Sequence, residues 1–92
     1  MRHARDEDLD QLDEMLVALR ALEALTEKAR GVFYRRSKAF LHFHDDPGGM
    51  FADVRTDPME GFVRVRVSTK AEQRRLLASI RRALARREDE RR

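Results

Sequence analysis

The stretch that most constrains the fold is residues 38–55, KAFLHFHDDPGGMFADVR. Apolar and polar residues alternate on both sides of a Pro-Gly-Gly sequence, and such alternation is typical of half-buried strands. Proline fixes one φ angle and glycine accepts positive ones, so this sequence predicts a tight connection. We therefore expect a β-hairpin with strands at residues 39–44 and 50–55.

A helix is predicted before the hairpin and another after the sheet. Leucines at three- and four-residue spacing predict a helix over residues 9–25 that ends before Gly31. Thr69 and Glu72 have the spacing of a capping box, in which each side chain caps a backbone N–H, so a second helix should begin at residues 68–69. Its apolar period stops at residue 86, and we expect residues 1–8 and 87–92 to be frayed.

Two more strands complete the predicted sheet, at residues 32–35 and 62–67, both rich in β-branched and aromatic residues. The order αββββα and the short connections predict one α+β domain, residues 1–92. It would be a two-layer sandwich, with a four-stranded antiparallel meander and both helices on one face. The predicted register sets His42 opposite Asp53 and His44 opposite Phe51, which keeps Asp53 out of the core. We expect the following residues to be nearly buried: Leu16, Leu19, Leu41, Phe43, Val54, Val65, Leu77 and Ile80.

Composition narrows the function classes. The chain has 92 residues and no cysteine, which excludes disulfides, zinc–thiolate sites and a thiol nucleophile. Neither a membrane-length apolar run nor a signal-peptide pattern is present, so a soluble cytoplasmic protein is expected. Residues 1–27 carry an excess of five acids and residues 28–92 an excess of eight basic groups. This asymmetry fits either nucleic-acid binding or two helices of opposite charge lying near each other.

The face of the sheet without helices is the expected functional surface. It is predicted to display Phe33, Arg35, Phe40, His42, His44, Phe51, Asp53, Arg55, Phe62, Arg64 and Arg66. Contiguous apolar area of this kind usually marks an interface, although a flanking segment could also cover it. Our first hypothesis is a non-enzymatic module that forms a homodimer or binds a protein partner through this face. The partner-binding residues would be Phe33, Phe40, Phe51, Phe62, Arg55, Arg64, Arg66 and Asp53.

Two alternatives use the same face. Arginines could meet the phosphates of a nucleic acid while Phe40 and Phe51 stack on its bases. Residues two apart on a strand point the same way, so His42 and His44 could bind one metal ion, with Asp53, or else Asp45 or Asp46, as the carboxylate ligand. Neither a nucleophile with an adjacent base nor a phosphate-binding glycine loop is recognisable, so we expect no enzyme activity, no catalytic residues and no cofactor.

The chain resembles the MmcQ/YjbR-like proteins over about residues 19–84. The likeness lies in a helix ending in Leu-Thr-Glu-Lys, the sequence VFYRRSKAFL with Phe33, Lys38 and Phe40, and the terminal helix. The resemblance implies a small α/β fold related in topology to frataxin-like domains. It also implies a possible link to DNA, which for that family rests on the fold. It supplies no catalytic residues.

Overall fold

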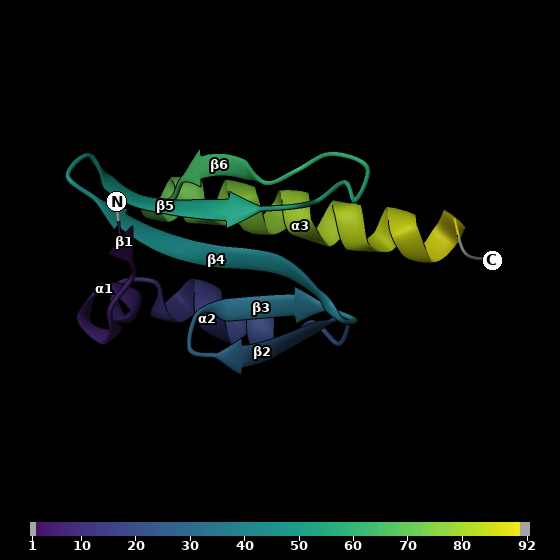
Figure 1. Cartoon of the computed structure of the whole chain (residues 1–92), viewed down its shortest axis with the longest axis horizontal. Helices are drawn as coiled ribbons and strands as arrows, with labels where there is room; N and C mark the ends of the chain where they lie inside the picture. Colours follow the sequence, from purple (N-terminus) through teal and green to yellow (C-terminus); the bar gives the residue numbers. More distant parts are fainter. Residues whose placement is uncertain (1, 91–92) are drawn as a thin grey trace.

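The computed structural model describes residues 2–90 (Figure 1). Nine elements follow one another along the chain: β1 (Arg2–His3), α1 (Asp6–Asp10), α2 (Asp13–Arg20), β2 (Leu25–Ala29), β3 (Val32–Arg35), β4 (Lys38–Asp46), β5 (Gly49–Val54), β6 (Val63–Arg66) and α3 (Lys70–Glu90). Helices and antiparallel strands occur together, so the fold is α+β.

The sheet is an antiparallel meander in the order β2-β3-β4-β5-β6, and the short strand β1 also pairs with β4. The hairpin predicted from the alternation is β4–β5. Its predicted register is confirmed, with His42 opposite Asp53 and His44 opposite Phe51. The predicted four-stranded meander corresponds to β3–β6. The sheet also contains β2, a strand that was not predicted.

The single helix predicted over residues 9–25 is wrong. Two helices, α1 and α2, are separated at residues 11–12, and β2 begins at Leu25. The leucine spacing continues across the break, since Leu9, Leu12, Leu16 and Leu19 are all buried. The apolar period therefore predicted the buried side of this segment correctly, but it did not predict the break between the two helices.

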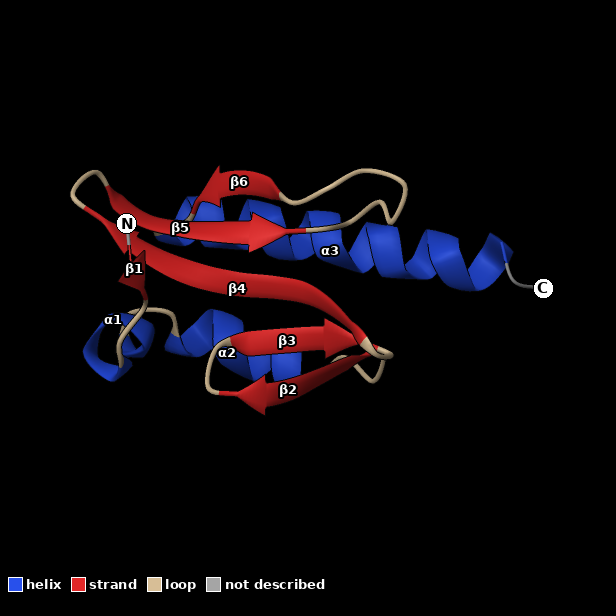
Figure 2. Cartoon of the chain, viewed as in Figure 1, coloured by secondary structure: helices blue, strands red, loops and turns tan. Residues whose placement is uncertain are grey.

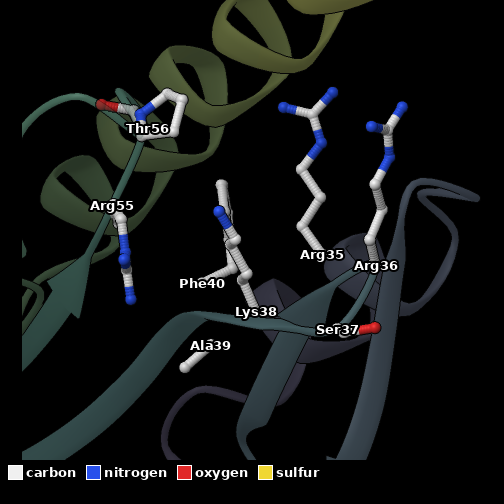
Figure 3. A pocket seen from close by; sticks show the side chains of 9 residues that line it. Arg35, Arg36, Ser37, Lys38, Ala39, Phe40, Arg55 and Thr56 are labelled. Carbon is white, nitrogen blue, oxygen red and sulfur yellow. The ribbon is translucent and has the colours of Figure 1, made fainter.

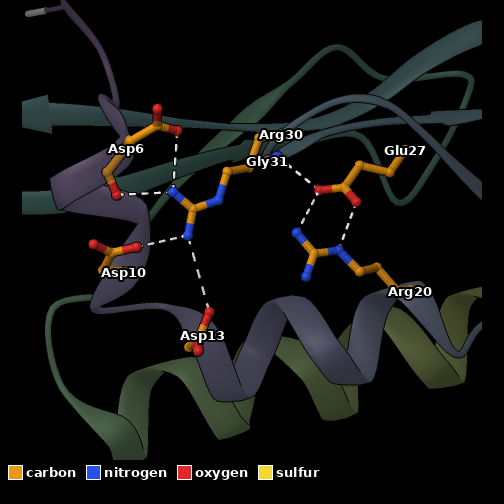
Figure 4. A network of polar contacts seen from close by, with 7 residues as sticks. All are labelled: Asp6, Asp10, Asp13, Arg20, Glu27, Arg30 and Gly31. Carbon is orange, nitrogen blue, oxygen red and sulfur yellow. Dashed lines mark hydrogen bonds and ion pairs between the residues drawn. The ribbon is translucent and has the colours of Figure 1, made fainter.

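Polar contacts hold the β2–β3 hairpin against the first two helices (Figure 4). Glu27 on β2 accepts hydrogen bonds from the Arg20 guanidinium at the end of α2 and from the Gly31 N–H, the latter at 2.9 Å. Arg30 donates to Asp6 Oδ1 at 3.0 Å and to Asp10 Oδ1 at 2.7 Å, both on α1. Gly31 was expected beyond a helix end and instead lies in the tight hairpin turn, with φ +78°.

Helices α2 and α3 lie behind the sheet in the view of Figure 2, whereas α1 lies beside β1 at its margin. The predicted layout of two helices on one face is therefore matched only in part. Six of the eight residues expected in the core are buried, and Val65 and Leu77 are partly buried and packed against it. The buried six are Leu16, Leu19, Leu41, Phe43, Val54 and Ile80.

Phe33 and Phe40 are also buried, although both were predicted on the exposed face. They retain only 1% and 3% of their accessible surface. The cause is an irregularity in the β3–β4 ladder, where Phe33 pairs with Leu41 but Tyr34 pairs with Ala39. One additional residue on β4 shifts the alternation, as in a β-bulge, and Phe33 becomes the partner of the core residue Leu41.

The predicted capping box opens α3. Thr69 N–H donates to Glu72 Oε1 at 2.9 Å, and Glu72 N–H donates to Thr69 Oγ1 at 3.1 Å. The helix continues to Glu90, beyond the end of its apolar period. Residue 1 and residues 91–92, which belong to the segments expected to be frayed, lie outside the described residues. Within the described part of the chain, no helix has both the length and the apolar character needed to cross a membrane.

Candidate metal centre

Three histidines from two strands converge on the open side of the sheet. His42 and His44 are two residues apart on β4 and therefore point to the same side. His3 lies directly opposite His44 because β1 pairs antiparallel with β4 in that register. The Ala4 N–H donates to the Phe43 carbonyl at 3.2 Å and holds the N-terminal segment in place. These are all the histidines of the chain.

The imidazole rings lie close to one another. One ring nitrogen from each histidine can be chosen so that the three atoms lie within 4.8 Å of one another. The ring centroids are 4.6 Å apart for His42 and His44, 5.4 Å for His3 and His44, and 5.8 Å for His3 and His42. No other group of three or more potential metal ligands is found among the described residues.

Asp53 on β5 orients His44. The Nε2 of His44 lies 2.7 Å from Asp53 Oδ2, and Arg64 Nε donates to Asp53 Oδ1 at 2.9 Å. The hydrogen bond from Arg64, together with the nearby charge of His44, holds the pKa of Asp53 below its usual value. An ionised carboxylate only accepts hydrogen bonds, so Nε2 of His44 carries the proton. In the neutral ring, the lone pair is then on Nδ1.

His42 has a polar atom whose hydrogen-bonding capacity is unused. Its Nδ1 is buried and has no hydrogen-bond partner in the described structure. Burial, followed by the charge of His44, lowers the pKa of His42 and favours the neutral ring. Neutral imidazole is the form that coordinates a metal ion. His42 therefore offers the cluster a neutral imidazole with one buried nitrogen that has no partner.

The set of metal ligands predicted from the sequence differs from this histidine cluster by one residue. The structure brings His42 and His44 together as expected, but Asp53 is engaged by His44 and Arg64, and the third imidazole comes from His3. Sequence reasoning missed His3 because a two-residue strand has no periodicity to detect. The expected cross-strand pair of His42 with Asp53 exists in the register, yet it is His44 that contacts the carboxylate.

Of the remaining residues predicted for a partner or nucleic-acid surface, two lie in the core and the others lie outside it. Phe33 and Phe40 belong to the core, so four phenylalanines do not share the open face. Phe51 is half-buried and Phe62 is 40% exposed. The guanidinium carbon of Arg55 lies 4.5 Å from the centre of the Phe62 ring, and this ring also packs edge-on against His42. Arg66 donates to the helix-capping residue Glu72 at 3.0 Å.

No protein-family model matches the chain, and no curated protein or solved structure matches it at the level of significance required. The resemblance to MmcQ/YjbR-like proteins therefore stays a prediction from the sequence.

Proposed function

We propose that this protein binds a divalent transition-metal ion, most simply Zn²⁺, through His3, His42 and His44. The observation that carries the proposal is the convergence of every histidine in the chain on one small region of the open face. Imidazole nitrogen is a preferred ligand of Zn²⁺, and three histidines with one open position form a known type of zinc site. Without thiolate ligands, the site would favour ions that accept nitrogen donors.

The geometry requires a modest adjustment on binding. Zinc–nitrogen bonds of about 2.0–2.1 Å in a tetrahedron place neighbouring nitrogens about 3.3 Å apart. The nitrogens here lie within 4.8 Å of one another, so an ion would draw the rings inward. His3 is the exposed member on a short strand, and its side chain can make most of this movement.

Asp53 would orient a metal ligand, His44, without binding the ion itself. A carboxylate that accepts the second ring N–H of a histidine ligand fixes its tautomer and orientation and raises its basicity. Asp53 stands in that relation to His44, and Arg64 holds the carboxylate in turn. Asp53→Asn is therefore expected to weaken metal affinity about tenfold or more, the usual effect of losing such a partner.

The direct test is thermal unfolding of the untagged protein with and without Zn²⁺. An ion at about 100 times its Kd stabilises the native state by about 2.7 kcal/mol. In a domain of this size, that corresponds to a rise in Tm on the order of 10 °C. His3→Ala should remove most of this rise, because it deletes one ligand without opening the core.

Two controls make the test specific. Mg²⁺, which prefers oxygen ligands, should leave Tm unchanged. The exposed Glu7→Gln, also near the N-terminus, should keep the full response to Zn²⁺. An unchanged Tm with excess Zn²⁺, or a full response in His3→Ala, would refute the proposal.

Self-association and nucleic-acid binding through the open face stay predictions from the sequence. Each has less apolar support than expected, because Phe33 and Phe40 are in the core. The metal proposal depends on neither phenylalanine.

A further inference from the structure

Strand β6 forms one edge of the sheet, and its outer side is free (Figure 1). The Val67 N–H donates to a carbonyl of β5 at 2.8 Å, so in this antiparallel register the N–H and C=O groups of Val63 and Val65 also point to β5. Those of the intervening Arg64 and Arg66 therefore point away from the sheet. No strand among residues 2–90 pairs with this outer side, which leaves two donors and two acceptors for an additional strand.

The same strand is poorly covered by the rest of the chain. Three of its four residues are exposed, and one of them is Val63, which keeps 53% of its accessible surface although alternation places it on the helix side with Val65. The other exposed large apolar side chains among the described residues are Val17, Met59 and Phe62, and the last two lie just before β6. Exposed apolar side chains gathered in one place usually mark a binding surface.

Strand β6 and helix α3 form the walls of a groove of about 360 Å³. Val65 and Leu76 give it apolar lining, and Arg75 and Ser79 give it polar lining. A strand added beside β6 would turn alternate side chains towards this groove while its main chain bonds to the free edge. Peptides that extend a sheet in this way gain affinity from main-chain hydrogen bonds and specificity from pockets for alternate side chains.

The side of α3 that borders this groove carries cations without counter-charges. Arg75 lines the groove, and Arg82 and Arg86 follow at helical spacings that place them on the same side of the helix. All three are exposed, and none forms an ion pair within residues 2–90, whereas the two arginines of β6 are each held by an acid of the chain. A bound segment with carboxylates would supply the missing counter-charges.

The cations at the other end of the sheet form no comparable set. A cavity of about 300 Å³ beside the β3–β4 turn has Arg35, Arg36 and Arg55 among its lining residues. Figure 3 shows that Arg55 points away from the other two, so the three side chains do not surround one ligand. The groove between β6 and α3 is therefore the better place for an acidic partner.

A second copy of the chain fits this edge poorly. If Arg64 and Arg66 bonded to the same strand of another copy, arginine would lie opposite arginine, and the unpaired arginines of α3 would approach their own copies. Like charges directly opposite one another are destabilising. The free edge therefore favours a partner with the opposite charge.

The spacing of the cations indicates the pattern of that partner. Arg75 and Arg82 are seven residues apart, or about 10 Å along α3. Side chains four residues apart on a strand lie about 13 Å apart on the same side, which two long acidic side chains can match. We propose that β6 binds an extended segment of another protein as an additional strand, with an apolar side chain over the groove and a carboxylate on either side of it. The proposal is independent of the metal site.

The experiment combines a peptide titration of the untagged protein at low salt with amide hydrogen exchange. The probe is the peptide acetyl-Thr-Glu-Thr-Val-Thr-Glu-Thr-amide, which has the proposed pattern on one side of a strand. In the free protein, the N–H groups of Val63 and Val65 should exchange slowly and those of Arg64 and Arg66 rapidly, because only the valines bond to β5. Saturating peptide should slow exchange at both arginines. Binding without this protection, or no binding at millimolar peptide, would overturn the proposal.

Two altered peptides test the chemistry of the partner. Replacing both glutamates by lysine should abolish binding, because cations would then face Arg75 and Arg82. Replacing the valine by glycine keeps the charges but removes the apolar contact, so affinity should fall about tenfold. Equal affinity for the glycine peptide would show only general charge attraction and would refute the site.

Protein variants test the edge itself. Arg64→Pro removes an outward N–H without removing a bond to β5, so the chain should fold while affinity falls about tenfold or more. Arg64→Ala loses the same side chain but keeps the N–H, and it should retain most of the affinity. Equal binding by the two variants would mean that no strand is added at this edge.

A second pair of variants does not alter the strand. Arg75→Gln should lower the affinity about two- to fivefold, the usual value of an exposed ion pair. Lys28→Gln removes an exposed cation from β2, at the opposite edge of the sheet, and should leave the affinity unchanged. Equal weakening by both would contradict a contact at α3.

Light scattering on the free protein distinguishes the partner from a second copy. A monomer that binds the peptide agrees with the proposal. Self-association that Arg64→Pro abolishes and Arg64→Ala preserves would assign the edge to a second copy and overturn the proposal of a foreign segment.

Discussion

Gly31 shows how a single residue closes the β2–β3 hairpin. Its φ of +78° lies in the left-handed region, and a Cβ added there would lie 2.8 Å from Leu9 Cδ2 and 3.5 Å from Phe43 Cδ2. Leu9 belongs to α1 and Phe43 to β4, so the turn packs directly against the core. Both the backbone conformation and the available space at this position favour glycine.

Gly31→Ala should therefore destabilise the protein by about 1–3 kcal/mol, since an alanine at this φ is strained and its Cβ displaces Leu9. Gly61→Ala is the matched control, because no atom lies within 4 Å of its added Cβ and its φ is not positive. Chemical denaturation of both variants measures the difference. Equal midpoints for the two would show that the turn tolerates a side chain.

At the histidine cluster, residue spacing in the sequence predicted two of the three members. The two-residue spacing of His42 and His44 placed them on one side of a strand, and the structure agrees. His3 carries no comparable signal, because its partner is more than forty positions away and its strand has two residues. One pairing between distant segments thus supplied the third member of the cluster.

At the scale of elements, β2 is the one strand of the meander that the sequence did not predict. Its sequence, LTEKA, contains one buried residue, Leu25, and follows a helix that shares its apolar spacing. Local propensity gave no reason to end the helix there. The strand is defined by its pairing with β3 and by the contact of Glu27 with Arg20, both of which require the tertiary fold. In contrast, the β4–β5 hairpin and the α3 cap were predictable because their signals are local.

The Glu27 contact predicts a dependence of stability on pH. The hydrogen bond from Arg20 is the main reason that the pKa of Glu27 lies below its usual value. A carboxyl group whose pKa is lower in the folded state stabilises the protein above its unfolded pKa, and this contribution is lost as pH falls through the folded pKa. Glu27→Gln should therefore cost about 0.5–1.5 kcal/mol at pH 7.

The difference between the native protein and Glu27→Gln should shrink as pH falls below about 4, the usual range of a glutamate pKa. Urea unfolding at a series of pH values measures this trend. Glu23→Gln alters an exposed glutamate that forms no hydrogen bond or ion pair with Arg20 in the described structure, so it should cost little stability at any pH. A constant difference between native protein and Glu27→Gln at all pH values would contradict the role of the Arg20 hydrogen bond.

At the scale of the whole molecule, the two sides of the sheet have different roles. Helices α2 and α3 lie on one side, where the core is continuous. The other side carries the histidine cluster with Asp53, which contacts His44, and Phe62, which contacts His42. Alternation predicted this division correctly for residues 41–44 of β4 and for β5. It failed for Phe33 on β3 and Phe40 on β4, which lie at the ladder irregularity. A bulge changes which residues face the core without changing the alternating pattern, so the sequence alone could not reveal it.

This division predicts very different costs for two phenylalanine truncations. Phe33→Ala should destabilise the protein by about 3–5 kcal/mol, because it empties space in the core, whereas Phe62→Ala should cost about 1 kcal/mol or less. Phe62 is 40% exposed and loses mainly its contacts with Arg55 and His42. Phe33→Leu, which keeps most of the side-chain volume, should fall between the two and guards against a variant too unstable to measure. Denaturant unfolding of the three variants gives the ranking, and a cost for Phe62→Ala equal to that of Phe33→Ala would mean that the open face is itself a packed interface.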